Sequence, residues 1–244
     1  MNLALTIDLF CGGPGSGCNP EVGKCGRPSL GEYNISEKKF TVLNKDQIRV
    51  PDFNPLATAA EIWSGNGFRT MRMVLAERAG TPIYMKPADS EKQTPEYKEA
   101  TLKYALLLVD KLNKAPVVDQ SLYRGISVTK SFQSVDKTIK EVESLFKPGT
   151  EFDEPLASFS KDRSVAEDFA AAGDVSVVFV MEKGKGLDVS KIAGRYNPVN
   201  ASEQEVISGG RFKVTQAKKR RGYHESELLE VRLQQLDTFD VSMK

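Results

Sequence analysis

SEQEVISGGRFKV, residues 202–214, is the stretch of sequence that decides the fold. Its apolar residues and paired glycines predict a strand over 205–207, a turn, and a second strand over 211–215. Alternate side chains of a strand share a face, so Glu203 and Glu205 are expected side by side. Two like charges this close repel each other, which makes the pair costly unless a cation or a chemical function requires it.

The sequence on the N-terminal side of this stretch changes character near residue 115. Before it, apolar residues follow helical spacing over 55–79, interrupted by Ser-Gly-Asn-Gly at 64–67, and again over 95–113. Further strands are expected at 122–128, 151–160, 176–181 and 228–233, with a short helix at 165–172. Helices first and strands after predict an α+β fold, with an N-terminal helical lobe and a mostly antiparallel sheet.

Composition excludes several classes of protein. The 244 residues carry 34 Lys and Arg against 33 Asp and Glu, a formal net charge of +1. No global field therefore favours nucleic acid or an anionic membrane. The one histidine, His224, argues against a histidine metal cluster and against a Ser-His-Asp triad. No apolar run approaches the roughly 20 residues that span a bilayer, so no membrane span is expected. With a single histidine, no metal site is expected either.

Residues 1–35 are expected to form a flexible leader rich in glycine and proline, ahead of a folded domain over 36–244. Cys11, Cys18 and Cys25 all lie in this leader. A metal knuckle and a disulfide are alternatives, but the odd number and the missing C-x-x-C spacing favour free thiols. The first ten residues lack the basic region of a secretory signal.

Three short segments occur in order: Tyr-Arg-Gly at 123–125, Ser-Phe-Ser at 158–160 and Glu-Gln-Glu at 203–205. Singly, each has a structural explanation, such as a solvated arginine or two hydroxyls on one strand face. Together they resemble the Arg-Ser-Glu class of mono-ADP-ribosyltransferases, a group that includes many bacterial toxins. SFSKDRSVAEDFA (158–170), VVFVMEKGKGLDVSKIAG (177–194) and WSGNGFRTMR (63–72) resemble the surrounding family segments. The resemblance covers residues 52–236, and the leader resembles segments beside phage head-morphogenesis domains.

The resemblance implies two packed small sheets with NAD in the cleft between them. Glu205 would hold the ribose 2′-OH and be the main catalytic residue, because a carboxylate stabilises an oxocarbenium-like transition state. Arg124 would grip the NAD phosphate, since a guanidinium fork suits that geometry. Ser158 would hydrogen-bond Glu205, with Ser160 as a neighbouring support.

The remaining implied contacts concern nicotinamide and the acceptor. The backbone of Gly125 would hold the nicotinamide amide, and the ring of Phe169 would stack on it. Glu203 would bind and help deprotonate an acceptor guanidinium, because Glu at this position goes with arginine acceptors in the family. Residues 193–202 would present the target, with Tyr196 either holding the acceptor or packing the loop.

These residues predict transfer of ADP-ribose from NAD to an arginine of a target protein, by a monomer acting in the cytoplasm of a target or host cell. Delivery would be in a virion or by secretion without a conventional signal peptide. An NAD glycohydrolase would use the same residues, and a virion-associated structural or delivery protein could carry the same fold. These alternatives remain open from sequence.

Some positions depart from the family pattern. Phe159 replaces a threonine, Trp63 and Phe68 replace tyrosines, and Arg72 replaces an asparagine. Arg72 is either a further phosphate contact or a solvated helix charge. The basic run at 218–221 is expected to be a solvated hairpin turn rather than a patch for nucleic acid or an acidic partner.

Overall fold

The computed structural model describes residues 31–34, 39–42, 55–80, 94–128, 135–192, 203–222 and 227–239. The three cysteines, His224 and the predicted target loop with Tyr196 lie outside the described residues. Strand β1 (Gly31–Asn34) pairs antiparallel with β2 (Lys39–Val42). The end of the predicted leader therefore contains a strand, and the rest of that leader is not described.

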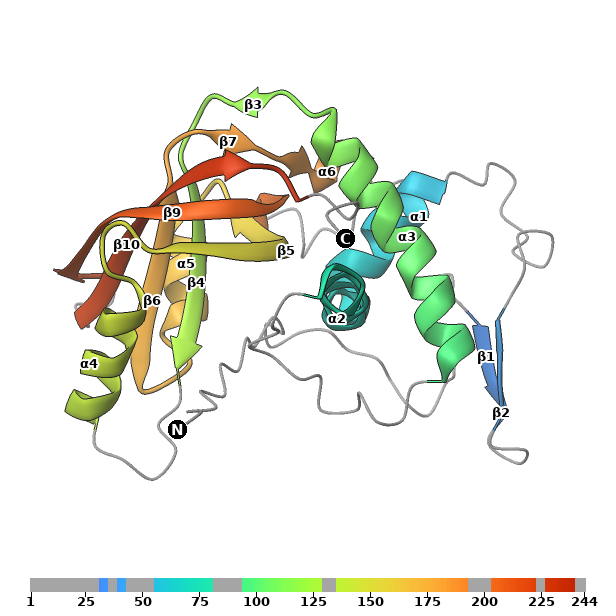
Figure 1. Cartoon of the computed structure of the whole chain (residues 1–244), viewed down its shortest axis with the longest axis horizontal. Coiled ribbons are helices and arrows are strands. Elements are labelled where there is room, and N and C mark those ends of the chain that lie inside the picture. Colours follow the sequence, from blue (N-terminus) through green and yellow to red (C-terminus); the bar gives the residue numbers. More distant parts are fainter. Residues whose placement is uncertain are drawn as a thin grey trace.

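The helical lobe contains α1 (Pro55–Ile62), the π-helical turn η1 (Trp63–Gly67), α2 (Phe68–Ala79) and α3 (Pro95–Asn113). The predicted helix over 95–113 is confirmed, and Thr94 caps it by accepting the Tyr97 N–H at 3.3 Å. The predicted interruption at 64–67 is confirmed as η1. Figure 1 shows these helices gathered on one side of the sheet.

The rest of the chain forms β3 (Val117–Val118), β4 (Leu122–Val128), α4 (Val135–Leu145), β5 (Glu151–Ser160), α5 (Arg163–Ala170), β6 (Val175–Met181), β7 (Gly184–Lys185), β8 (Leu187–Asp188), α6 (Val189–Ile192), β9 (Glu205–Arg221) and β10 (Glu227–Asp237). The main sheet has the order β10-β6-β4-β5-β9-β8, and β9 also pairs with β10. β10 runs parallel to β6, and the other pairings are antiparallel. The predicted α+β class is confirmed.

The main sheet consists of two halves that pack against each other. In the described chain, β4 meets β5 at one register pair, Tyr123 with Ser160. The halves β10-β6-β4 and β5-β9-β8 are therefore joined mainly through the long pairing of β9 with β10, and their strands cross in Figure 1. Helix α4, which the sequence analysis did not predict, packs beside β6 and contributes Val142 to the core.

Two predictions about β9 are wrong. The strands expected at 205–207 and 211–215 are one continuous strand, because Gly210 bends it without ending it. Gly210 has φ +131°, and a Cβ there would lie 1.8 Å from the Asp237 carbonyl oxygen. The basic run at 218–221 is not a turn, because these residues pair with β10 up to Arg221 opposite Glu227.

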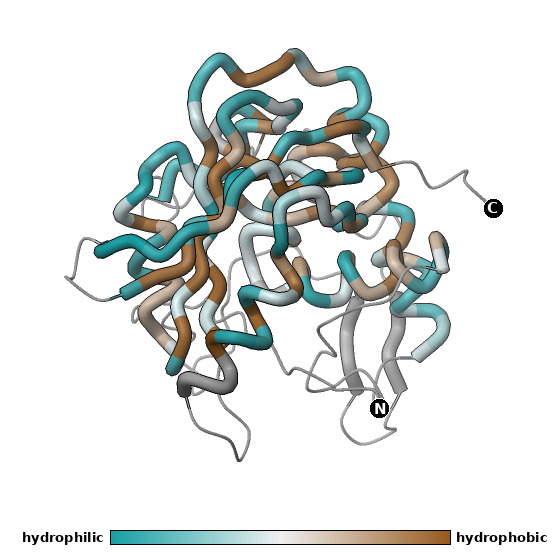
Figure 2. Tube along the Cα trace, turned by 60° about the vertical axis from the view of Figure 1, so that its left-hand side comes forward, coloured by the Kyte–Doolittle hydropathy of each residue, from teal (hydrophilic) through white to brown (hydrophobic). Residues whose placement is uncertain are grey.

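Apolar side chains form three clusters. One lies between the sheet halves and α4, and it includes Phe159, Phe179 and Phe212. A second joins the helical lobe to Leu156 of β5 and Ile207 of β9, and a third lies under α5. Figure 2 shows the hydrophobic stretches following the crossing strands. The helical lobe therefore packs on the face of β5 and β9 that carries Leu156 and Ile207.

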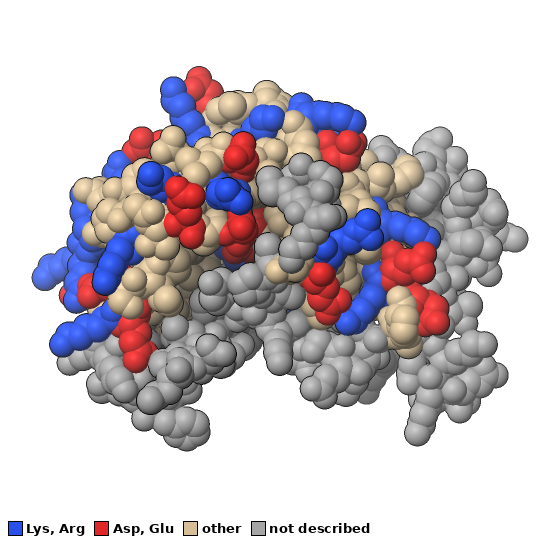
Figure 3. Space-filling model, viewed as in Figure 1, with Lys and Arg blue, Asp and Glu red and all other residues tan. Residues whose placement is uncertain are grey.

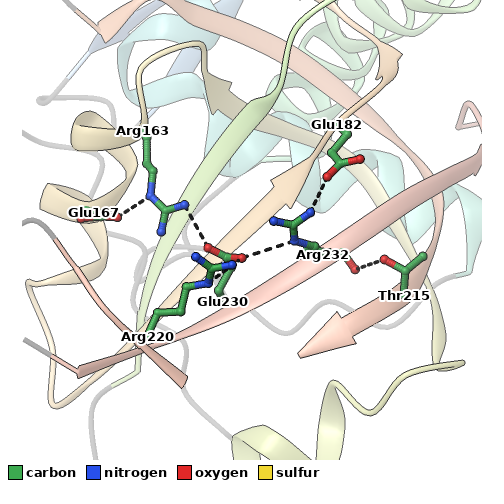
Figure 4. Close-up of polar contacts among 7 residues, drawn as sticks. All are labelled: Arg163, Glu167, Glu182, Thr215, Arg220, Glu230 and Arg232. Carbon is green, nitrogen blue, oxygen red and sulfur yellow. Dashed lines mark hydrogen bonds and ion pairs between the residues drawn. The ribbon is translucent and has the colours of Figure 1, made fainter. Parts of the chain in front are cut away.

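A buried carboxylate ties α5 to β9 and β10 (Figure 4). Glu230 is 1% exposed and accepts a hydrogen bond from Arg163 Nη1 at 2.9 Å. Arg220 and Arg232 lie on its other oxygen at 3.1 and 3.4 Å. Arg163 also donates to Glu167 at 2.6 Å. Part of the basic run thus neutralises a buried charge inside the fold.

Positive and negative side chains are interspersed over the face drawn in Figure 3, as the net charge of +1 leads one to expect. None of the described helices is long and apolar enough to cross a membrane.

Candidate active site

The site is centred on Glu205, the first residue of β9. Side chains alternate along a strand, so Glu205 shares the face of Ile207, and Ser158 shares that of Leu156. Leu156 and Ile207 pack against the helical lobe. Glu205 and Ser158 therefore face that lobe, and Glu205 is 7% exposed.

Three donors surround the Glu205 carboxylate. Ser158 Oγ donates to Oε1 at 2.6 Å, the contact that the family resemblance implied. Trp63 Nε1 lies 3.1 Å from the same oxygen and 3.0 Å from Ser158 Oγ. Ser64 Oγ donates to Oε2 at 2.8 Å. The carboxylate is thus fixed from β5 on one side and from η1 on the other.

Sequence reasoning did not identify Trp63 and Ser64 as site residues. In the sequence, Trp63 stands where the family pattern has a tyrosine, and Ser64 begins the insert that predicts a helix break. The sequence feature that could have indicated them is a tryptophan next to a serine in a glycine-rich turn. That feature does not show what the two side chains contact, because only the folded chain brings Glu205 to this turn.

The pKa of Glu205 is raised above the ordinary value for glutamate, because burial disfavours the charged form. Hydrogen bonds from Ser158, Ser64 and Trp63 act in the opposite direction and lower the pKa. The pKa of Glu203 is also raised, first by desolvation and then by the charge of Glu205. The structure therefore brings the two carboxylates close enough to repel each other.

The expected geometry of this pair is corrected in one respect. Glu203 precedes β9 and is not on a strand face, because Gln204 has φ +47°. Ser160 Oγ donates to the Glu203 carbonyl at 2.6 Å and accepts the Asp162 N–H at 2.9 Å. Ser160 thus holds the backbone at Glu203, and the left-handed conformation of Gln204 separates Glu203 from the strand that begins at Glu205.

Replacing Gln204 tests this backbone. Gln204→Gly should leave activity and stability near wild type, because glycine adopts positive φ without strain. Gln204→Val should destabilise the protein by about 1–2 kcal/mol, since a β-branched residue is strained there. Thermal unfolding measures the difference, and equal melting temperatures for the two variants would show that the turn is not left-handed.

Arg124 lies at a different part of the site. It is 8% exposed, and Nη1 lies 3.7 Å from Glu154 Oε2. Arg72 of α2 bonds the other oxygen of Glu154, so it is an ion-paired, largely buried residue rather than a solvated helix charge. A register shift between Glu154 and Ala157 interrupts the alternation of β5. Glu154 therefore lies on the side of Phe152, toward the core between the sheet halves, whereas Ser158 faces the helical lobe. The two guanidinium groups and Glu154 thus form a charged group separate from the carboxylates of Glu203 and Glu205.

A cavity of about 210 Å³ opens beside these arginines. Its lining combines Arg72, Arg124 and Glu154 with apolar side chains from both halves of the sheet, among them Phe146, Phe152, Phe159, Phe179 and Phe212. Phe159, the departure from the family's threonine, is 3% exposed and points into this core, opposite the face of Ser158. Its substitution therefore removes no hydroxyl from the surroundings of Glu205.

Helix α5 packs closely on β4 next to Arg124. A Cβ at Gly125 would lie 1.7 Å from the Ala166 carbonyl oxygen, so the glycine is required for this approach. Phe169 lies on the same helix and is partly exposed. The structure explains Gly125 by packing alone.

Lys161, the residue after β5, contacts both Asp188 and Gln204. Lys161 Nζ lies 2.5 Å from Asp188 Oδ2, just before α6. The Lys161 N–H donates to the Gln204 carbonyl at 3.3 Å. Within the described residues, no group of three or more His, Cys, Asp or Glu side chains could hold a metal ion.

No protein-family model matches the chain, and no curated protein matches it. Among solved structures it is similar to the ADP-ribosyltransferase Vis of Vibrio splendidus in complex with agmatine, with 18% identity over 75% of this chain and 76% of that one and a TM-score of 0.48. It is also similar to exoenzyme S of Pseudomonas aeruginosa bound to carba-NAD, with 14% identity over 78% of each chain and a TM-score of 0.46.

Proposed function

We propose that the chain is a mono-ADP-ribosyltransferase that cleaves NAD and transfers ADP-ribose to an arginine side chain. The observation that carries this proposal is Glu205, a buried carboxylate held by three donors. The bond broken is the one between the ribose C1′ and the nicotinamide nitrogen. The bond formed joins C1′ to a guanidinium nitrogen, which loses a proton.

Glu205 fits the cleavage step. Nicotinamide leaves with the bonding electrons, which neutralises its own positive charge and leaves positive charge on the ribose. A carboxylate fixed beside that ribose stabilises the charge without reorganising, because Ser158, Trp63 and Ser64 already hold it. The ribose 2′-OH would donate to Glu205, and Phe169 and the Gly125 backbone would contact nicotinamide.

Arg124 and Arg72 fit the pyrophosphate. Both guanidinium groups flank Glu154, and a planar fork binds phosphate oxygens bidentately. Ser160 supports the site by holding the Glu203 backbone.

Glu203 fits the transfer step. Its pKa is raised by burial and by Glu205, which makes it a better proton acceptor near neutral pH. It would bind the acceptor guanidinium, while residues 193–202 and Tyr196 present the target protein. The acceptor would be a protein of a target or host cell, modified in the cytoplasm.

The experiment that tests this function uses NAD labelled in its ADP-ribose portion, incubated with the purified full-length chain and agmatine as a small guanidine. Mass spectrometry should show labelled ADP-ribosyl-agmatine. Free ADP-ribose alone would make the protein an NAD glycohydrolase, with water as the acceptor. Intact NAD would favour a structural or delivery role for the chain.

A further inference from the structure

The turn η1 has a local structure that depends on its glycines. Gly65 lies outside the helical region, with φ −92° and ψ −144°. A Cβ at Gly67 would lie 2.4 Å from Ile62 Cγ2 and 2.8 Å from the Ile62 carbonyl oxygen. The Ser-Gly-Asn-Gly insert therefore does more than interrupt a helix, because its glycines build a tight kink between α1 and α2.

This turn directs two neighbouring donors at one carboxylate. Trp63 is 1% exposed and packs edge-on against Phe68 at 6.3 Å, so its indole has a fixed direction. Its N–H lies between Ser158 Oγ and Glu205 Oε1. Ser64 donates to Oε2, the oxygen that neither Trp63 nor Ser158 contacts. Two of the three donors on Glu205 thus come from the helical lobe.

We infer that Trp63 and Ser64 are positioning residues for Glu205, so that docking of the helical lobe on β5 and β9 completes the catalytic geometry. A carboxylate held by Ser158 alone could rotate about its terminal torsion, which is broad for glutamate. Donors on both oxygens fix the plane of the group. The kinetic part of this inference rests on the proposed function, and its structural part does not.

The donors also favour the ionised form of Glu205. Burial raises its pKa, while Trp63, Ser64 and Ser158 lower it. The charge of Glu205 in turn raises the pKa of Glu203, which belongs to the same segment. Loss of either η1 donor should therefore raise the pKa of Glu205 further and narrow the pH range in which it is charged.

Variants of Ser64 and Trp63 test the kinetic part. Ser64→Ala and Trp63→Phe should each lower kcat about tenfold, which corresponds to one hydrogen bond to a charged group. The KM for NAD should change less, and the acid limb of the kcat/KM profile should move to higher pH. Ser64→Thr retains the hydroxyl and should restore the wild-type profile. Wild-type kcat and pH profile in both Ser64→Ala and Trp63→Phe would overturn the inference.

A measurement without catalysis tests the structural part. Trp63 is the chain's single tryptophan, so its indole N–H gives one resonance in a ¹H–¹⁵N spectrum. That resonance should shift with pH as Glu205 titrates in the wild type, and the shift should be absent in Glu205→Gln. An identical titration in both proteins would contradict the contact. If the wild type did not cleave NAD, the proposed function would be wrong. The pH titration of the Trp63 resonance would still show whether Trp63 contacts Glu205.

Discussion

Glu205→Gln should lower nicotinamide release from NAD by at least about a hundredfold, with transfer to agmatine falling equally. The substitution keeps the shape of the side chain and removes the negative charge that faces the ribose in the transition state. Loss of a single preorganised electrostatic contact commonly has an effect of this size. Chromatographic measurement of nicotinamide gives the rate, and a rate near wild type would remove Glu205 from the mechanism.

The same variant should remain folded. The pKa of Glu205 is raised by burial, so the folded state binds this proton more tightly than the unfolded state does. The ionised carboxylate therefore costs stability above its folded-state pKa, and Glu205→Gln should melt no lower than the wild type at neutral pH. The difference should vanish as the pH falls below the unfolded pKa of glutamate. Glu99→Gln, on the exposed surface of α3, is the matched control for both measurements.

Glu203→Gln should separate the two half-reactions. Transfer to agmatine should fall about a hundredfold or more, because the agmatine guanidinium loses the carboxylate that binds it and accepts its proton. Cleavage of NAD with water as acceptor should remain measurable, since Glu205 and its three donors are unchanged. The ratio of ADP-ribosyl-agmatine to free ADP-ribose measures the separation.

The pH dependence of the wild type adds a check on Glu203. Its pKa is raised, so transfer should increase with pH through a range above the ordinary value for glutamate. If transfer and hydrolysis fell in parallel in Glu203→Gln, Glu203 would belong to NAD cleavage and the preference for arginine would lose its basis.

Much of the fold could be predicted from local patterns. The helix over 95–113 follows from its apolar spacing, and Pro95 marks its first turn. Helix α4 was missed, although Ile139 and Val142 lie three residues apart and both pack on the core. The continuity of β9 could not be predicted, because a glycine pair is equally compatible with a turn and with a bend opposite Asp237.

The candidate site, like the fold, could be predicted from the sequence only in part. The resemblance placed Ser158 beside Glu205, and the structure has that hydrogen bond. It did not identify Glu154, whose importance comes from the two arginines on either side of it. Such partners lie 82 and 30 residues away in the chain, so no local pattern could have revealed them.

One measurement tests the proposed activity most directly. The purified full-length chain is incubated with NAD and agmatine, and nicotinamide and ADP-ribosyl-agmatine are quantified over time in the same sample. The two products should appear in nearly equal amounts, and both should be absent with Glu205→Gln. Undiminished NAD after prolonged incubation with the folded wild-type protein would contradict the proposed transferase.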